Sequence, residues 1–160
     1  MPFRIPLKPL EINHLATIAD FQFGAGTGKF LSTLNLKAEH SPKTKRMKFI
    51  YYNDERIFSY RVNDGYLIPS IYGGILIYSE GFGLTVIANN DAETFVKQGK
   101  TLFAKFVADA MDSISSQDEV FVINEKKEFI AVGTALLPGS LMKTIKKGSA
   151  VNIRKGIENS

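Results

Sequence analysis

The amino-acid sequence predicts an α+β fold, in which a small α/β domain is followed by a mostly β domain. Three observations indicate this. Helical spacing of apolar residues is confined to short segments such as residues 10–19. Strand-like runs of β-branched and aromatic residues recur along the chain and become frequent after Leu84. Between the halves, residues 79–83 contain two glycines and a serine, so we predict domains at residues 1–80 and 81–160.

In the first half, we expect a helix at residues 10–19, after an extended, proline-containing start. Residues 49–52 and 57–62 have strand character and are separated by a short polar turn, which is typical of an antiparallel hairpin. Residues 68–78 are predicted to form a helix or a buried connector. The turn at residues 43–48 is basic, and it is either an RNA contact or a solvated loop.

A glycine-rich segment near position 26 invites comparison with phosphate-binding loops, because glycines let backbone amides approach an anion. The spacing excludes such a loop. Phe23 stands where the P-loop pattern needs its first glycine, and Phe30 stands where a serine or threonine would hold magnesium. The dinucleotide-binding pattern fails as well, since Lys29 replaces its last glycine. We therefore expect a glycine-rich turn between helical pieces.

In the second half, a short amphipathic helix is expected after a strand at residues 84–88. Asn90 is predicted to cap this helix, with Glu93 completing a capping box. Gly99 is predicted to end it. Ala92, Phe95 and Val96 have the spacing of one packed face.

Residues 101–107 alternate like a strand, which would place Phe103 and Lys105 on the face opposite Leu102, Ala104 and Phe106. The further strands are predicted at residues 118–122, 129–135 and 150–154.

This order of elements resembles a PUA domain, which is a small RNA-binding pseudo-barrel. The most specific parts of the resemblance are KTLFAKFV at residues 100–107 and AVGTA at residues 131–135. The resemblance implies a mostly β pseudo-barrel in the second half. It also implies that the groove between the short helix and the strand after it receives an unstacked base or a strand end.

The first half also resembles a known domain, on the evidence of DFQFG at residues 20–24, the segment 41–46 and RVNDG at residues 61–65. It is similar to the α/β domain that precedes the PUA domain at the C-terminus of archaeal archaeosine tRNA-guanine transglycosylase and its relatives. The resemblance implies tRNA recognition. The transglycosylase activity is not implied, because 160 residues cannot hold a catalytic barrel of about 250 residues.

The formal net charge of +4 is concentrated in residues 141–160, which carry five cations against one carboxylate. A local basic excess is the footprint expected for phosphate contacts. With the predicted groove it defines the candidate RNA-binding residues, namely Lys97, Gly99, Lys100, Phe103, Lys105, Lys143, Lys146, Lys147, Arg154 and Lys155.

The sequence contains no cysteine and only two histidines, His14 and His40, so it lacks thiol chemistry and a metal-ligand pattern. Catalysis would depend on carboxylates such as Asp20 or Asp64 or on a lysine, and no carboxylate pair or nucleophile-base arrangement is recognisable. We therefore expect an RNA-binding protein without enzymatic activity, metal or cofactor.

The expected partner is RNA, with tRNA favoured, and the expected role is recognition for RNA modification. One alternative is a protein-interaction subunit that docks a separate tRNA-modifying enzyme, and a less favoured one is an RNA-modifying enzyme. No apolar run approaches the length of a membrane span, so we expect no membrane contact and a cytoplasmic location.

Overall fold

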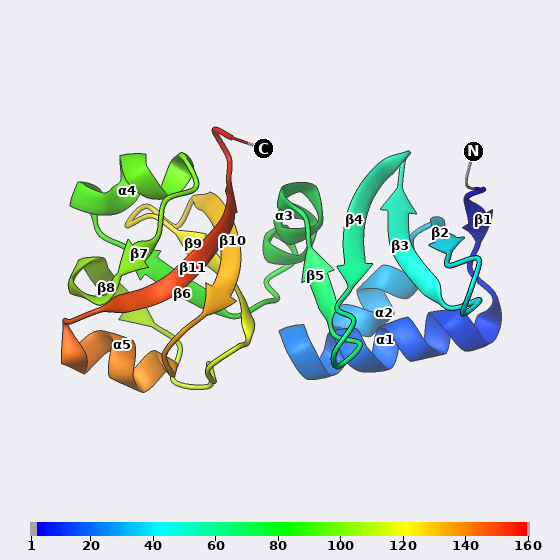
Figure 1. Cartoon of the computed structure of the whole chain (residues 1–160), viewed down its shortest axis with the longest axis horizontal. Coiled ribbons are helices and arrows are strands. Elements are labelled where there is room, and N and C mark those ends of the chain that lie inside the picture. The colour runs from blue at the N-terminus through cyan, green and yellow to red at the C-terminus, as the bar shows by residue number, and fades with distance from the viewer. Residues whose placement is uncertain (1–2, 160) are drawn as a thin grey trace. The chain divides into compact units, whose positions relative to one another are not determined.

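The structure is a computed structural model that describes residues 3–159 and divides into two compact units. The N-terminal unit comprises residues 1–82 and the C-terminal unit comprises residues 83–160. Each unit has its own sheet, of five and six strands respectively (Figure 1). Among residues 3–159, no helix has the length and apolar character that crossing a bilayer demands.

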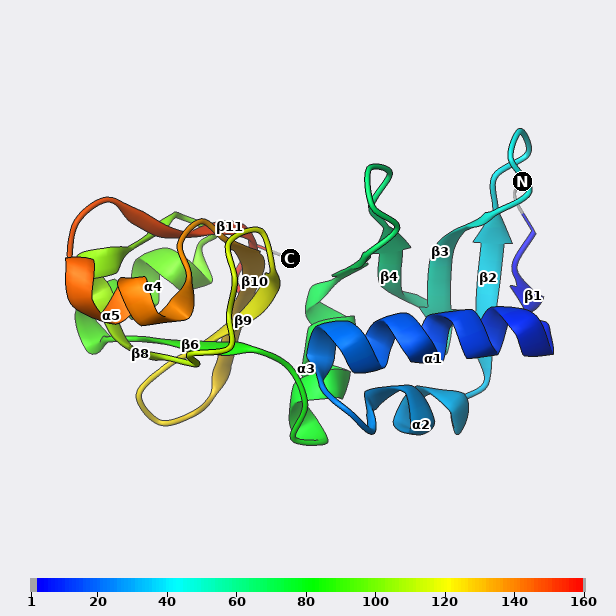
Figure 2. The same cartoon turned by 90° about the horizontal axis from the view of Figure 1, so that it is seen from below.

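The sheet of the N-terminal unit is antiparallel, with its strands in chain order. The strands are β1 (Ile5–Pro6), β2 (Leu36–His40), β3 (Met47–Tyr52), β4 (Glu55–Tyr60) and β5 (Leu67–Pro69). Helix α1 (Pro9–Phe23) crosses them and packs on α2 (Thr27–Ser32), while α3 (Ile71–Ser79) follows β5 (Figures 1 and 2). Because neighbouring strands are antiparallel, the β2–β3 and β4–β5 loops emerge at the same end of the sheet (Figure 2).

The predicted first helix is confirmed and is longer than expected, because residues 20–23 continue it. Its buried Gln22 explains part of the extension. The Gln22 side chain accepts a hydrogen bond from the Leu67 backbone N–H at 2.6 Å and donates one to the Leu67 carbonyl at 3.0 Å. This pair joins α1 to β5, so the last turn of the helix contributes to the packing of the unit.

The glycine-rich segment is a turn between two helices, as predicted. Gly24 and Gly26 have φ angles of +116° and +101°, which side chains disfavour. The Asp20 carboxylate accepts hydrogen bonds from the backbone N–H groups of Gly26 at 3.2 Å and Gly28 at 2.7 Å. Asp20 thus binds the two amides that a phosphate-binding loop would have offered to its ligand.

The predicted hairpin also forms, with a shorter turn than expected. Strands β3 and β4 are joined by Asn53 and Asp54 alone, which have φ angles of +51° and +63°. Two left-handed residues in succession are typical of a type I′ turn, whose twist matches that of the strands. The predicted connector at residues 68–78 contains the end of β5 and most of α3.

The C-terminal unit is a nearly closed β pseudo-barrel, which confirms the predicted fold class. Its strand order is β7 (Leu102–Phe103), β11 (Ser149–Gly156), β10 (Phe129–Ala135), β9 (Glu119–Ile123), β6 (Thr85–Ala88) and β8 (Val107–Ala110). Among the strands of residues 3–159, the β6–β9 pair alone is parallel. Helices α4 (Asn90–Lys97) and α5 (Gly139–Ile145) lie at opposite ends of this barrel (Figure 1).

The prediction of one continuous strand over residues 101–107 is wrong. The chain pairs with β11 through β7, turns through the 3₁₀ helix η1 (Ala104–Phe106), and then pairs with β6 through β8. One segment therefore pairs with both free edges of the sheet, and η1 is the corner between the two pairings. Leu102 and Ala104 are fully buried, whereas Phe103 and Lys105 are exposed, so the predicted separation of the two faces is confirmed.

The cap of α4 is displaced by one residue from the prediction. The Asn89 side chain, and not that of Asn90, accepts a hydrogen bond from the Ala92 N–H at 3.2 Å. Glu93 forms no capping box and binds Lys97 instead. The predicted stop is confirmed, since Gly99 has a φ angle of +88° and donates to the Val96 carbonyl, while the Lys100 N–H donates to Phe95.

Arg154, Glu119 and Thr134 connect three strands of the barrel through the Glu119 carboxylate. Its Nη1 lies 2.6 Å from Oε1 of the buried Glu119 on β9. The Thr134 hydroxyl on β10 donates to the other carboxylate oxygen of Glu119 at 3.0 Å. A buried carboxylate that loses its cation is left poorly compensated, so this contact supports the barrel.

We predict that Arg154→Ala lowers the free energy of unfolding by about 1.5–3 kcal/mol, the usual value of a hydrogen bond to a charged group. Lys155→Ala is the matched control, because Lys155 is the next residue of β11 and is exposed. It should cost about 0.5 kcal/mol or less. Chemical denaturation of both variants measures the difference, and equal stabilities would contradict the proposed tie.

Candidate nucleic-acid interface

All ten predicted RNA-binding residues lie in the C-terminal unit, but the structure distributes them over separate places. Lys97, Gly99 and Lys100 lie at the C-terminal end of α4. Phe103 and Lys105 lie on β7 and η1, next to the turn that contains Lys146 and Lys147. Because α4 and α5 occupy opposite ends of the barrel, the predicted set is not one continuous cluster (Figure 1).

At the end of α4, internal contacts occupy part of the predicted site. The Lys97 ammonium lies 2.8 Å from the Glu93 carboxylate. This hydrogen bond raises the pKa of Lys97, and together with a hydrogen bond from Asn124 it lowers the pKa of Glu93. A phosphate at Lys97 would therefore compete with a carboxylate that already binds it.

Gly99 is covered by the chain itself. A Cβ atom on Gly99 would collide with Nδ2 of Asn159, which donates a hydrogen bond to the Gln98 carbonyl at 3.0 Å. Asn159 Oδ1 in turn accepts from the Gly156 N–H at 2.8 Å. The Asn159 side chain therefore occupies the space that the absence of a Cβ on Gly99 leaves open.

Phe95 lies outside the packed face of α4 on which its spacing had placed it, and its side chain is 51% exposed. The Lys100 ammonium lies 5.5 Å from the centre of its ring. Ala92 and Val96 on the same helix are buried, whereas Phe95 is an exposed aromatic beside a cation.

The strongest cluster surrounds Phe103, and we call Phe103, Lys105, Lys146 and Lys147 the Phe103 surface. Phe103 pairs with Ser149 across the β7–β11 ladder, and the Ala104 N–H donates to the Gly148 carbonyl at 2.8 Å. These backbone contacts bring η1 beside the turn after α5.

The side chains of the Phe103 surface combine an aromatic face with positive charge. Phe103 is 45% exposed, so its ring is available on the surface and does not belong to the core. The Lys146 ammonium donates to the Val107 carbonyl at 3.0 Å. Within residues 3–159, Lys105 and Lys147 form no salt bridge to a carboxylate. Together these residues can stack on a base and neutralise phosphates.

The remaining predicted cations have different surroundings. The Lys143 ammonium lies 2.6 Å from Asp112 and 3.9 Å from Asp109, and the hydrogen bond to Asp112 raises its pKa. Arg154 is held by Glu119. Lys155 is exposed on β11 and lies away from the Phe103 surface, at the opposite end of that strand from Ser149.

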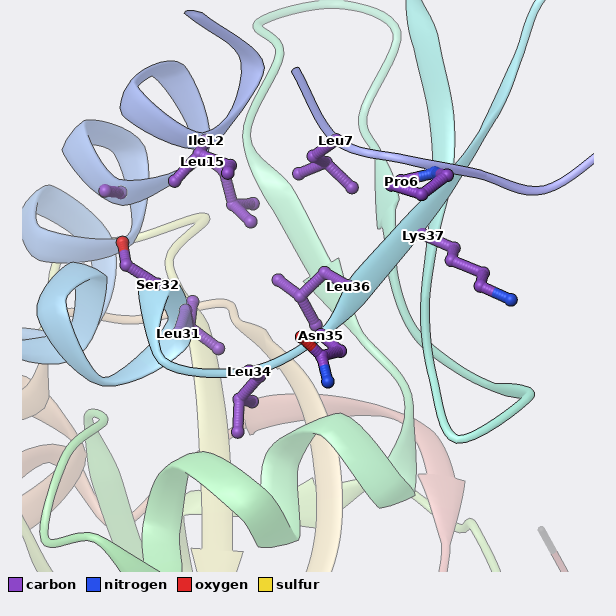
Figure 3. Close-up of a pocket in the computed structure, with 11 residues that line it drawn as sticks. Pro6, Leu7, Ile12, Leu15, Leu31, Ser32, Leu34, Asn35, Leu36 and Lys37 are labelled. Atoms are coloured by element: carbon purple, nitrogen blue, oxygen red, sulfur yellow. The ribbon is translucent and has the colours of Figure 1, made fainter. Parts of the chain in front are cut away.

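The N-terminal unit contains an apolar cavity with a volume of about 430 Å³ between α1, α2 and β2 (Figure 3). Leu7, Leu15, Leu31 and Leu36 point into it, and Lys37 extends away from them. Lys37 is the one ionisable residue of its lining. This cavity offers hydrophobic contact and lacks groups for acid-base chemistry.

Comparison with known proteins identifies both halves of the chain. Residues 85–157 match the PUA domain, and residues 13–80 match the patch-forming domain C2 of tRNA-guanine transglycosylase. A tRNA-guanine(15) transglycosylase from Methanothermobacter thermautotrophicus is 34% identical over 148 residues. That alignment covers 91% of this chain and 23% of the relative. The relative from Pyrococcus abyssi is 33% identical, and the alignment covers 95% of this chain and 26% of that protein.

Solved structures show the same fold. A hypothetical protein from Pyrococcus horikoshii superposes with a TM-score of 0.75 at 23% identity, covering 96% of this chain and 94% of that one. A conserved PUA domain protein from Thermoplasma acidophilum gives a TM-score of 0.68 at 25% identity, with coverages of 96% and 93%. The chain spans about a quarter of the length of its curated relatives. It consists of a patch-forming C2 domain of the tRNA-guanine transglycosylase type followed by a PUA domain.

Proposed function

We propose that this protein binds tRNA and acts as a recognition module for RNA modification. The observation that carries the proposal is the domain order, because the C2 and PUA domains together align with relatives named tRNA-guanine(15) transglycosylase over more than 90% of this chain. The match to the PUA domain supports RNA binding in general. The names of the relatives favour tRNA as the particular RNA.

The role we propose is recognition, with the chemistry supplied by a separate tRNA-modifying enzyme. The carboxylates considered as catalytic candidates support this assignment, since both have structural partners. Asp20 binds the backbone amides of α2, and Asp64 forms a hydrogen-bonded ion pair with Arg61 at 2.7 Å. The hydrogen bond from Arg61 lowers the pKa of Asp64, which makes this carboxylate a weaker base.

Binding at the Phe103 surface would combine two kinds of interaction. An unstacked base would lie on the exposed face of Phe103, since base–aromatic stacking tolerates any base. Lys105 and Lys147 would neutralise the flanking phosphates and release counterions, which makes binding weaken as salt increases. Lys146 is held to the Val107 carbonyl, so it would position the turn as well as add charge.

We predict that the protein binds folded tRNA more tightly than DNA of similar length, and that removing the 3′ end of the tRNA weakens binding. The reason is that the proposed site accepts an unpaired end or loop, which duplex DNA does not present. Gel shifts with the three nucleic acids at one salt concentration measure this. Absence of binding to any of them would favour the protein-interaction alternative, for which the leucine-lined cavity offers a hydrophobic surface (Figure 3).

Phe103→Ala should weaken tRNA binding while leaving the melting temperature nearly unchanged. The ring is 45% exposed, so its loss removes little core packing. Loss of one stacked base costs about 1–3 kcal/mol, or roughly 5- to 150-fold in affinity. Phe3→Ala is a matched control, because Phe3 is an exposed phenylalanine of the other unit. A large drop in melting temperature, or unchanged affinity, would count against stacking on Phe103.

Lys147→Ala should reduce the salt dependence of tRNA binding by about one phosphate contact. Lys126→Ala is the control, since Lys126 lies in the β9–β10 turn, outside the Phe103 surface. Titrations over a series of salt concentrations give the slope for each variant. If both variants keep the slope of the native protein, then Lys147 does not contact a phosphate.

A further inference from the structure

The N-terminal unit carries a larger net positive charge than the C-terminal unit, although the most basic stretch of the sequence is at the C-terminal end. The N-terminal unit has 10 basic and 7 acidic residues, whereas the C-terminal unit has 10 basic and 9 acidic residues. The excess in the N-terminal unit includes Lys43, Lys45, Arg46 and Lys48, which form a run without a carboxylate. This run is the β2–β3 loop and the first residues of β3.

The β2–β3 loop is ordered by its own hydrogen bonds. The Ser41 N–H donates to the Arg46 carbonyl at 2.8 Å, and the Lys45 N–H donates to the Ser41 carbonyl at 2.9 Å. Lys45 has a φ angle of +63°, which completes the tight turn. The cations are therefore presented by a defined loop, which emerges beside the β4–β5 loop at the same end of the sheet (Figure 2).

A pocket with a volume of about 780 Å³ lies between these two loops and the first half of α1. Lys45, Arg46 and Lys48 line it on the side of the β2–β3 loop. Two apolar lining residues, Leu10 and Val62, are 81% and 98% exposed, so their surfaces are uncovered. The volume falls within the range that accommodates small-molecule ligands.

The carboxylates of this pocket are already paired, which leaves its outer cations uncompensated. Glu11 lies 2.5 Å from His40 Nε2 and accepts from the Lys8 N–H at 2.9 Å. Asp64 is held by Arg61. In the described part of the chain, no carboxylate forms a salt bridge with Lys45, Arg46 or Lys48.

Two aromatic rings contribute to the pocket. His14 and Tyr60 stack with their ring centres 6.1 Å apart. The Tyr60 hydroxyl is shielded from solvent and has no hydrogen-bond partner among residues 3–159. Burial, with a smaller effect of Glu11, raises the pKa of Tyr60, so the hydroxyl keeps its proton. Because the hydroxyl is shielded, a ligand in the pocket would meet the rings of His14 and Tyr60 and not this group.

We propose that this pocket of the N-terminal unit binds a single-stranded nucleotide of RNA, with the base against His14 and Tyr60 and its flanking phosphates at Lys45, Arg46 and Lys48. Cations next to an aromatic pair fit a base and its phosphates better than an acidic peptide, which would satisfy the cations alone. The inference rests on the proposed RNA binding and adds a second contact to it.

The test uses the full chain and two probes, a single-stranded ribo-oligonucleotide and folded tRNA. His14→Ala removes the exposed ring of the stacked pair, so it should fold normally and lose roughly fivefold or more in affinity for the oligonucleotide. The double variant Lys45→Ala, Arg46→Ala should lower the salt slope by about 0.7 for each phosphate that the protein no longer binds. Lys43→Ala is the control, because Lys43 belongs to the same loop but does not line the pocket.

The outcomes separate this inference from the proposed function. Native affinity in His14→Ala and an unchanged slope in the double variant, together with weaker binding by Phe103→Ala, would overturn the second site and leave the Phe103 surface standing. A second result would also overturn it, in favour of an acidic partner. In that case poly-glutamate would bind the native protein but not the double variant, while the double variant would bind the oligonucleotide with native affinity. If the native protein binds neither RNA probe, both proposals fail.

Discussion

Closure of the barrel by residues 102–110 is the constraint on which the C-terminal unit depends. This segment must pair with β11 at one edge of the sheet and with β6 at the other, and a straight strand cannot reach both. The 3₁₀ turn at Ala104–Phe106 solves this geometric problem. It keeps Leu102, Ala104 and Val107 in the core and leaves Phe103 and Lys105 on the surface beside the Lys146–Gly148 turn. The proposed binding surface is therefore a consequence of how the sheet closes.

Internal ion pairs decide which of the many cations remain available to a phosphate. Three cations have carboxylate partners, namely Lys97 with Glu93, Lys143 with Asp112 and Arg154 with Glu119. The first pair lies within α4, and the other two join segments that are distant in the chain. The exposed pairs of Lys97 and Lys143 contribute little stability, whereas the pair of Arg154 with the buried Glu119 supports the barrel. All three pairs set a competing partner against any ligand. A count of charges along the sequence overestimates the positive charge available to a phosphate, because it records each cation but not the carboxylate that binds it.

The two units use aromatic residues next to cations in different settings. In the C-terminal unit the aromatic face is Phe103 on an edge strand, and in the N-terminal unit His14 and Tyr60 line a pocket below two loops. The strand order places those loops at one end of the sheet, although two strands and a turn separate them in the chain. Recognition of RNA by such a protein would depend on unpaired nucleotides, whose bases are free to stack.

The sequence by itself determined the α+β class, the first helix, the hairpin and the stop at Gly99, because each depends on local periodicity or on a residue with a special backbone conformation. The pseudo-barrel was expected from the resemblance to the PUA domain. It also separated Phe103 and Lys105 from the buried face of their segment. Local spacing could not decide between Asn89 and Asn90 as a cap, because both are good caps and only the docked helix distinguishes them.

The tertiary structure alone decided the rest. The corner at η1 follows from pairing with two distant strands, and the cover over Gly99 comes from Asn159, which is remote in sequence. The ion pairs of Arg154 and Lys143 join residues that the chain separates by more than 30 positions. The pocket around Tyr60 likewise needs α1 and two loops at one end of a sheet. Contacts between remote segments depend on packing, and packing has no signature in the spacing of neighbouring residues.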